Sequence, residues 1–237
     1  MSVAVQQDFL ELCDYLRAYS LGLSVNNPEY VKLIKRAHRK FLAALTFSAE
    51  SEAQNTAAKK PTKRNQAAAQ YFKESVSDLG CAVFCLCNGA YKPGRVMLRS
   101  ALETLAKGLA VSKSLRVLKE KSVHSVISEA KEISLFSHSV PAVQYARLET
   151  YYSLLCEDVH TAGIANMAHV SSMAAFPGFD LSEARQLEDL FSKVSTVVLS
   201  IQVMFLKENY NKMHFSNRPI VRQGIHRDVV KYLSGEH

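Results

Sequence analysis

The sequence predicts an all-α protein: a helical bundle of about four long core helices with an N-terminal helical hairpin and a short C-terminal basic helix. Three observations lead to this prediction. Apolar residues recur at helical spacing in successive segments, none of these segments shows strand-type alternation, and helix-start signals precede several of them. The 237 residues are 48% hydrophobic and 22% charged, which is enough for one sizeable core or two small ones.

Residues 1–48 are expected to form the helical hairpin and to pack on the body of the protein. Its first helix is predicted over about residues 4–21, from apolar residues at helical spacing. Asn27 and Pro28 then form a start signal for the second helix, because Asn caps a helix and Pro suits its first position. That helix is predicted to end near residue 48.

Residues 49–65 are polar and contain few large apolar side chains. This composition is typical of a surface connection, and we expect a mobile linker there. Residues 66–237 would then form the main body, with a basic extension at the C-terminus.

The main body begins with two helices joined by a short turn, which is typical of an antiparallel helical hairpin. The first is predicted from about Gln66 to Asn88, and the second contains Arg95–Ala110. A further amphipathic helix is expected over residues 114–135, and Pro141 opens one that ends near His160.

Asp180 opens the last long helix of the body. Glu183 follows it at capping-box spacing, and apolar residues continue to about Asn209. A short basic helix over residues 226–233 completes the prediction.

Arg99 and Glu103 are two charges inside an otherwise apolar helical segment. A helix that is apolar nearly all round is buried, so both residues are expected in or beside the core. Their i,i+4 spacing lets the side chains face each other. The pair is therefore either a structural ion pair or part of a functional site.

Basic residues give the chain a formal net charge of +7. Such an excess suits a polyanion, and it also keeps an ordinary surface solvated. The residues that we expect to contact nucleic acid are Arg95, Lys212, Arg218, Arg222 and Arg227.

The sequence lacks the signature motifs of several classes of enzyme. The sequence contains no GxxxxGK[ST] phosphate loop, no HExxH zinc motif and no GxSxG nucleophile motif, and it implies no metal and no cofactor. It has no apolar run of membrane-spanning length, and its N-terminus does not resemble a secretory signal. We therefore expect a cytoplasmic protein without membrane contact.

Two segments together resemble the HEPN superfamily, the helical nucleotide-binding domains of higher eukaryotes and prokaryotes. They are Arg99-Ser-Ala-Leu-Glu103 and Tyr152-Ser-Leu-Leu-Cys-Glu-Asp-Val-His160. The resemblance covers about residues 66–210. It implies an all-helical bundle, often dimeric, and many relatives are metal-independent ribonucleases of toxin–antitoxin, phage-defence and RNA-processing systems.

Other relatives are catalytically silent and serve as interaction or ligand-binding modules. Active members usually carry Arg-x(4–6)-His on one helix, and the spacing from Arg222 to His226 is one residue too short. The resemblance thus leaves two functions open. One is a ribonuclease effector or toxin, and the other is a non-catalytic module that binds a protein partner or nucleic acid in a larger defence complex. Either would work as a homo-dimer or in a hetero-complex with a protein encoded nearby.

Cleavage of RNA through its 2′-hydroxyl needs a base, an acid and a cation on the phosphate. His160 suits the acid–base role, because imidazole titrates near neutral pH. Arg99 suits the phosphate, because its planar fork of donors matches phosphate oxygens. Glu103 would orient either residue, and Asp158 would tune His160. The structural alternative is a buried Arg99–Glu103 pair, with His160 placed at a helix C-terminus by the helix dipole.

Overall fold

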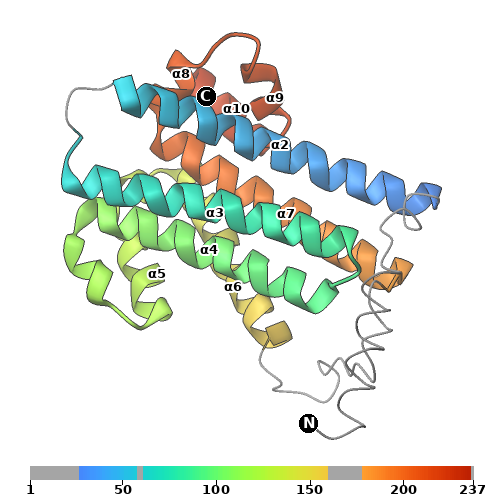
Figure 1. Cartoon of the computed structure of the whole chain (residues 1–237). Coiled ribbons are helices and arrows are strands. Elements are labelled where there is room, and N and C mark those ends of the chain that lie inside the picture. Colours follow the sequence, from blue (N-terminus) through green and yellow to red (C-terminus); the bar gives the residue numbers. More distant parts are fainter. Residues whose placement is uncertain (1–26, 58–60, 160–177, 236–237) are drawn as a thin grey trace, which may run out of the picture.

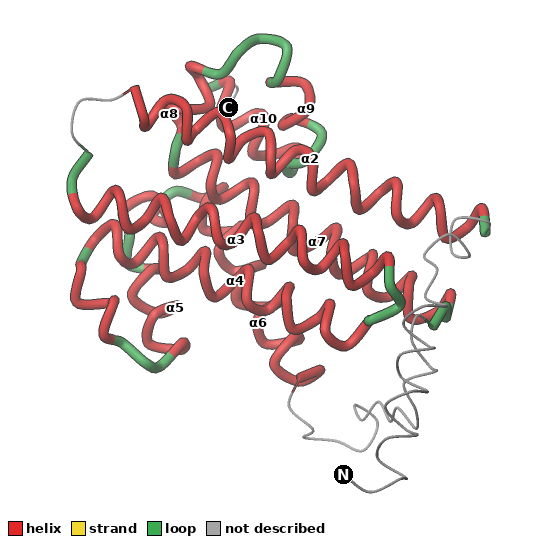
Figure 2. Tube along the Cα trace, in the orientation of Figure 1, coloured by secondary structure: helices red, strands yellow, loops and turns green. Residues whose placement is uncertain are grey.

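The computed structural model describes residues 27–57, 61–159 and 178–235. These residues form helices joined by turns, without any strand, as Figures 1 and 2 show. The all-α prediction is confirmed. The first predicted helix, over residues 4–21, lies outside the described residues, and the division into a hairpin and a four-helix core stays a prediction.

The long helices occupy most of the described chain. They are α2 (Pro28–Ala57), α3 (Lys63–Cys87), α4 (Tyr91–Lys113), α6 (Ser139–Val159) and α7 (Leu181–Phe205). Shorter elements connect or follow them: η2 (Leu115–Lys119), α5 (Val123–Lys131), η3 (Ser134–Ser137), α8 (Lys207–Lys212), α9 (Arg218–Arg222) and α10 (Arg227–Ser234). None of the described helices combines the length and the apolar character needed to cross a bilayer.

The expected linker over residues 49–65 is wrong for most of its length. α2 continues through it to Ala57, and α3 already begins at Lys63. Tertiary contacts stabilise the polar end of α2, where Gln54 Nε2 donates a hydrogen bond of 3.1 Å to Asn209 O. Thr62 then caps α3 by accepting a 3.2 Å hydrogen bond from Asn65 N.

Capping residues decide where the other boundaries fall. Asn27 and Asp180 cap α2 and α7 through their side-chain oxygens, as the start signals predicted. The helix predicted over residues 114–135 is instead divided into η2, α5 and η3, because Ser114 and Ser122 each cap a new element. The last long helix ends at Phe205 rather than near Asn209, and α8 follows it.

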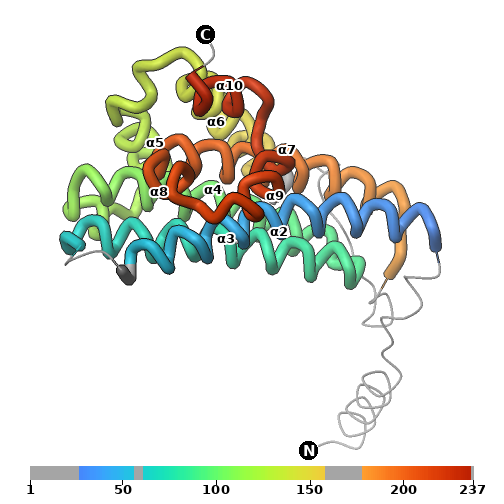
Figure 3. The backbone as a smooth tube through the Cα atoms, turned by 90° about the horizontal axis from the view of Figure 1, so that it is seen from above, coloured from blue at the N-terminus to red at the C-terminus, as the bar shows by residue number. Residues whose placement is uncertain are grey.

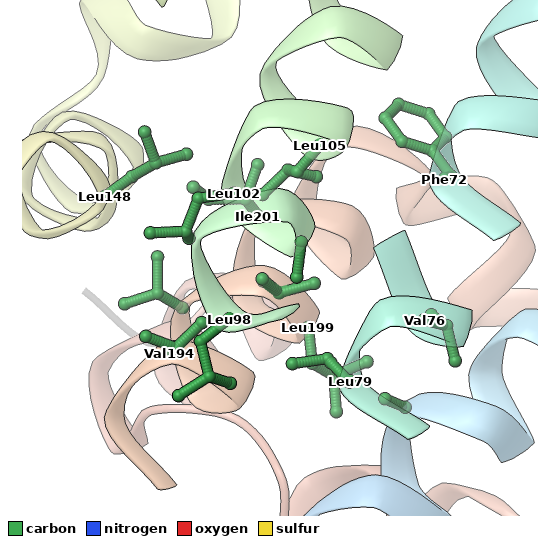
Figure 4. Close-up of a cluster of buried hydrophobic side chains, with 14 of the residues drawn as sticks. Phe72, Val76, Leu79, Leu98, Leu102, Leu105, Leu148, Val194, Leu199 and Ile201 are labelled. Atoms are coloured by element: carbon green, nitrogen blue, oxygen red, sulfur yellow. The ribbon is translucent and has the colours of Figure 1, made fainter. Parts of the chain in front are cut away.

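The core lies where α4 is surrounded by other helices. α4 contacts α3 on one side and α5, α6 and α7 on the others, so its apolar residues are buried nearly all round. Figure 4 shows this cluster, with Leu98, Leu102 and Leu105 of α4 among side chains from α3, α6 and α7. Arg99 and Glu103 lie on the remaining part of the α4 surface.

Two pairs of helices determine the arrangement of the bundle. α3 and α4 form an antiparallel hairpin through a tight turn in which Gly89 has φ of 66°. α2 and α7 run side by side in the same direction, since Arg36 bonds Glu188 and Lys40 bonds Thr196 (Figure 1). In Figure 3, α6 and α10 lie on the opposite side of α7 from α2.

Candidate functional site

Arg99 and Glu103 form an ion pair on the surface of α4. Arg99 Nε donates a hydrogen bond of 2.7 Å to Glu103 Oε1, as the i,i+4 spacing predicted. The side chains are 20% and 26% exposed, so the pair lies beside the core and remains within reach of solvent. Burial alone lowers the pKa of Arg99, but the hydrogen bond and charge of Glu103 raise it above its ordinary value. The guanidinium is therefore a permanent cation at this position.

Tyr152 of α6 faces this pair. The guanidinium carbon of Arg99 lies 5.7 Å from the centroid of the Tyr152 ring, which is cation–π range. Burial, together with hydrogen bonding to Cys156 and the charge of Glu103, raises the pKa of Tyr152 to about 12, although Arg99 opposes the shift. Tyr152 thus stays a neutral phenol with a proton to donate. The structure thus brings Tyr152, the first residue of one HEPN-like segment, beside Arg99 and Glu103 of the other.

The other two predicted catalytic residues lie at the end of α6. Asp158 is in the last turn of the helix, which ends at Val159, and only its backbone is described. His160 lies outside the described residues. The joint role of His160 and Arg99 in one site therefore stays a prediction.

A buried acid beside this cluster was missed from the sequence. Asp78 of α3 is buried, and Thr104 Oγ1 of α4 lies 3.3 Å from its Oδ2. Burial raises the pKa of Asp78, and the charges of Glu74 and Glu103 add to the shift, while hydrogen bonds from Ser100 and Thr104 oppose it. The sequence signal that could have identified Asp78 is a single acidic residue at an inward position of the helix that forms α3. Perturbed acids of this kind are frequent at functional sites.

The residues predicted to contact nucleic acid do not form one surface. Arg95 of α4 binds Glu183 at the start of α7, with 2.9 Å between Arg95 Nη2 and Glu183 Oε2. Lys212 follows the opposite end of α7, a helix of 25 residues and therefore about 37 Å long. These two cations cannot contact the same phosphate.

Among the other predicted cations, Arg218 is hydrogen-bonded within the protein, whereas Lys212, Arg222 and Arg227 are exposed. Arg218 donates to the carbonyl of Asn211, and its Nε is buried. Arg222 and Arg227 are exposed, and Arg222 Nε donates a 3.2 Å hydrogen bond to Tyr210 Oη. Lys212 is exposed too and lies 3.7 Å from Glu208. The accessible part of the predicted surface is therefore Lys212, Arg222 and Arg227 in the C-terminal segment.

The described residues contain no group of three or more His, Cys, Asp or Glu that could hold a metal ion. No protein-family model, curated protein or solved structure matches the chain. The HEPN resemblance accordingly stays a prediction that rests on the two segments quoted above.

Proposed function

We propose that this protein acts on RNA as a HEPN-like, metal-independent endoribonuclease in bacterial defence or a toxin system. One observation carries the proposal: Arg99 and Glu103 on α4 meet Tyr152 on α6, the helix whose C-terminal end leads to Asp158 and His160. A fixed cation beside a neutral phenol is suited to phosphodiester chemistry, and the proposal adds His160 as the acid–base residue.

The reaction would proceed through the 2′-hydroxyl of the RNA. His160 would remove its proton, and the oxygen would attack phosphorus to form a 2′,3′-cyclic phosphate. The bond to the 5′ oxygen would break as that oxygen takes up a proton from water, and His160 would return its own proton to the solvent. Arg99 would bind the phosphate, and Glu103 would hold the guanidinium in position through the 2.7 Å hydrogen bond. Asp158 would tune His160. No metal and no cofactor enters this scheme, and the cytoplasm is the compartment that we assign to it.

The test is incubation of the purified protein with RNA in the presence of EDTA, with wild type, His160→Ala and Arg99→Ala compared. Removing an acid–base residue is expected to slow cleavage by about 10²–10⁴-fold. His138→Ala is the matched control, because His138 is exposed at the start of α6 and far along the helix from Tyr152. Absence of cleavage, or cleavage that His160→Ala leaves unchanged, would contradict the proposal.

The active form is proposed to be a homo-dimer or a hetero-complex with a protein encoded nearby. Native mass spectrometry of the complex purified from its host measures this directly. Cleavage assays are then repeated on that complex. They distinguish a chain that needs its partner for activity from a protein that has no ribonuclease activity.

The second candidate is a non-catalytic helical module that binds a protein partner or nucleic acid. The favouring observation is the position of Arg99 between Glu103 and Tyr152, which also suits a strut between α4 and α6. In this case RNA binds without cleavage, and binding weakens with salt. Arg222→Ala and Arg227→Ala would each lower the salt dependence by about 0.7 in log–log slope, whereas His160→Ala would have no effect.

A further inference from the structure

A cavity of about 680 Å³ opens at the end of the bundle, where the C-terminal part of α2 meets the start of α3 and the end of α7. Its size falls in the range of small-molecule sites. Of the described residues of the candidate ribonuclease site, Arg99, Glu103 and Tyr152 do not line it. Any function of this cavity therefore lies beyond the proposed function.

Aromatic rings form the apolar walls. Phe47 of α2 and Phe72 of α3 are buried, and both line the cavity. The rings of Phe72 and Phe205 pack edge to face, with their centroids 5.5 Å apart. Phe72 and Phe205 thus hold each other in place, and this wall is preformed for a flat apolar body.

Two buried polar side chains reach the same cavity. Ser51 is 6% exposed, and its Oγ has no hydrogen-bond partner among the described residues. Gln202 is 2% exposed, and its Nε2 donates a 3.2 Å hydrogen bond to Phe72 O. Buried hydroxyls are nearly always paired, so the unpaired Ser51 marks a place where a ligand group would complete the bonding.

Among the described residues that line the cavity, the charged side chains are those of one ion pair. Glu52 and Lys73 are the charged members of the described lining, both are exposed, and 2.7 Å separates Lys73 Nζ from Glu52 Oε1. Because these two charges neutralise each other, an ionic ligand would find no surplus counter-charge among the described lining residues. The cavity therefore favours a neutral ligand.

We propose that this cavity binds a neutral heteroaromatic small molecule. The ring would lie against Phe47, Phe72 and Phe205, and a donor–acceptor edge would meet Ser51 and Gln202. A hydroxyl can both donate and accept, so Ser51 fits either half of such an edge.

Thermal unfolding and calorimetric titration with adenosine, indole and adenosine 5′-monophosphate test the proposal. Adenosine or indole is expected to raise the Tm by about 3–6 °C at ten times its Kd. The phosphorylated compound is expected to bind no more tightly than adenosine. Absence of a shift with both neutral probes, or tighter binding of the phosphorylated one, would overturn the proposal.

Two variants and a matched control assign any binding to the cavity. Ala69→Leu fills it from α3 and should abolish the ligand-induced shift, whereas Ala146→Leu on the exposed face of α6 should leave the shift intact. Ser51→Ala should weaken binding by about 3–10-fold while the free protein unfolds at the same or a higher temperature, since a buried unpaired hydroxyl is removed. Equal binding by wild type and Ala69→Leu would overturn the assignment.

Discussion

Arg36 on α2 forms an ion pair with Glu188 on α7, and the carboxylate of Glu188 is completely buried. The two residues are separated by 152 positions in the sequence. Ser192 Oγ also donates a 2.7 Å hydrogen bond to Glu188 Oε1. The ion pair between Arg36 and Glu188 thus links α2 to α7.

Arg36→Ala is expected to lower the free energy of unfolding by about 2–4 kcal/mol, because it leaves a buried carboxylate without its cation. The double variant Arg36→Ala/Glu188→Gln should recover most of the loss. Urea denaturation measures both effects, with Lys35→Ala on the exposed side of α2 as the control. A loss no larger than that of Lys35→Ala would show that the pair does not stabilise the fold.

Asp78→Asn is expected to stabilise the protein near neutral pH. Because burial raises the pKa of Asp78, the ionised carboxylate is disfavoured in the folded state, and wild type loses stability as the pH rises through that value. The gain should reach up to about 1 kcal/mol, since Ser100 and Thr104 partly compensate the charge. It should vanish as the pH falls from the folded-state pKa towards the unfolded value of about 3.9.

Denaturation of wild type and Asp78→Asn across this pH range measures the difference. Asp189→Asn, at an exposed position of α7, is the matched control and should change stability by less than about 0.5 kcal/mol. Parallel pH profiles for wild type and Asp78→Asn would contradict the assignment.

A double-mutant cycle between Arg99 and Tyr152 measures how strongly α4 and α6 are coupled. For Arg99→Met and Tyr152→Leu, the coupling free energy is expected to be about 0.5–1 kcal/mol, the usual size of a partly exposed cation–π contact. Chemical denaturation of both single variants and the double variant gives this value. Strictly additive effects would mean that the guanidinium does not bind the ring.

Gly224→Ala is expected to destabilise the protein by about 1–3 kcal/mol. A Cβ at this position would lie 2.6 Å from the Cβ of Ala43 in α2 and 2.5 Å from Leu199 Cδ2. Gly80→Ala is the control, because its Cβ would meet only the outer edge of the Phe41 ring, at 3.0 Å, and alanine favours the helix. Thermal unfolding should separate the two variants clearly; equal Tm values would contradict this account.

Local features of the fold and the site could be predicted from the sequence. Asn27 and Asp180 cap helices through bonds to residues two or three positions away, so their role follows from neighbouring letters. The Arg99–Glu103 pair is equally local, because it spans one helical turn. These predictions are confirmed because no distant residue is needed to decide them.

Features that depend on tertiary packing could not be predicted in this way. Ser51 belongs to a polar stretch that was expected to be a mobile linker, yet it lies buried in α2, which packs against α3, α7 and α8. The partner of Arg36 is 152 positions away, and no local pattern points to it. Asp78 is at an inward position of α3, but its carboxyl group is buried only because α4 packs against that helix.

Parallel packing of α2 against α7 bears on the order in which the protein assembles. Parallel neighbours cannot be joined by a tight turn, and here α3, α4 and α6 come between them in the chain. The α3–α4 hairpin closes a short loop and can form early, whereas α2 meets α7 only after most of the chain has been synthesised. Until then the face of α2 that packs against α7 has no cover from that helix, and the nascent chain is most vulnerable to aggregation during this interval.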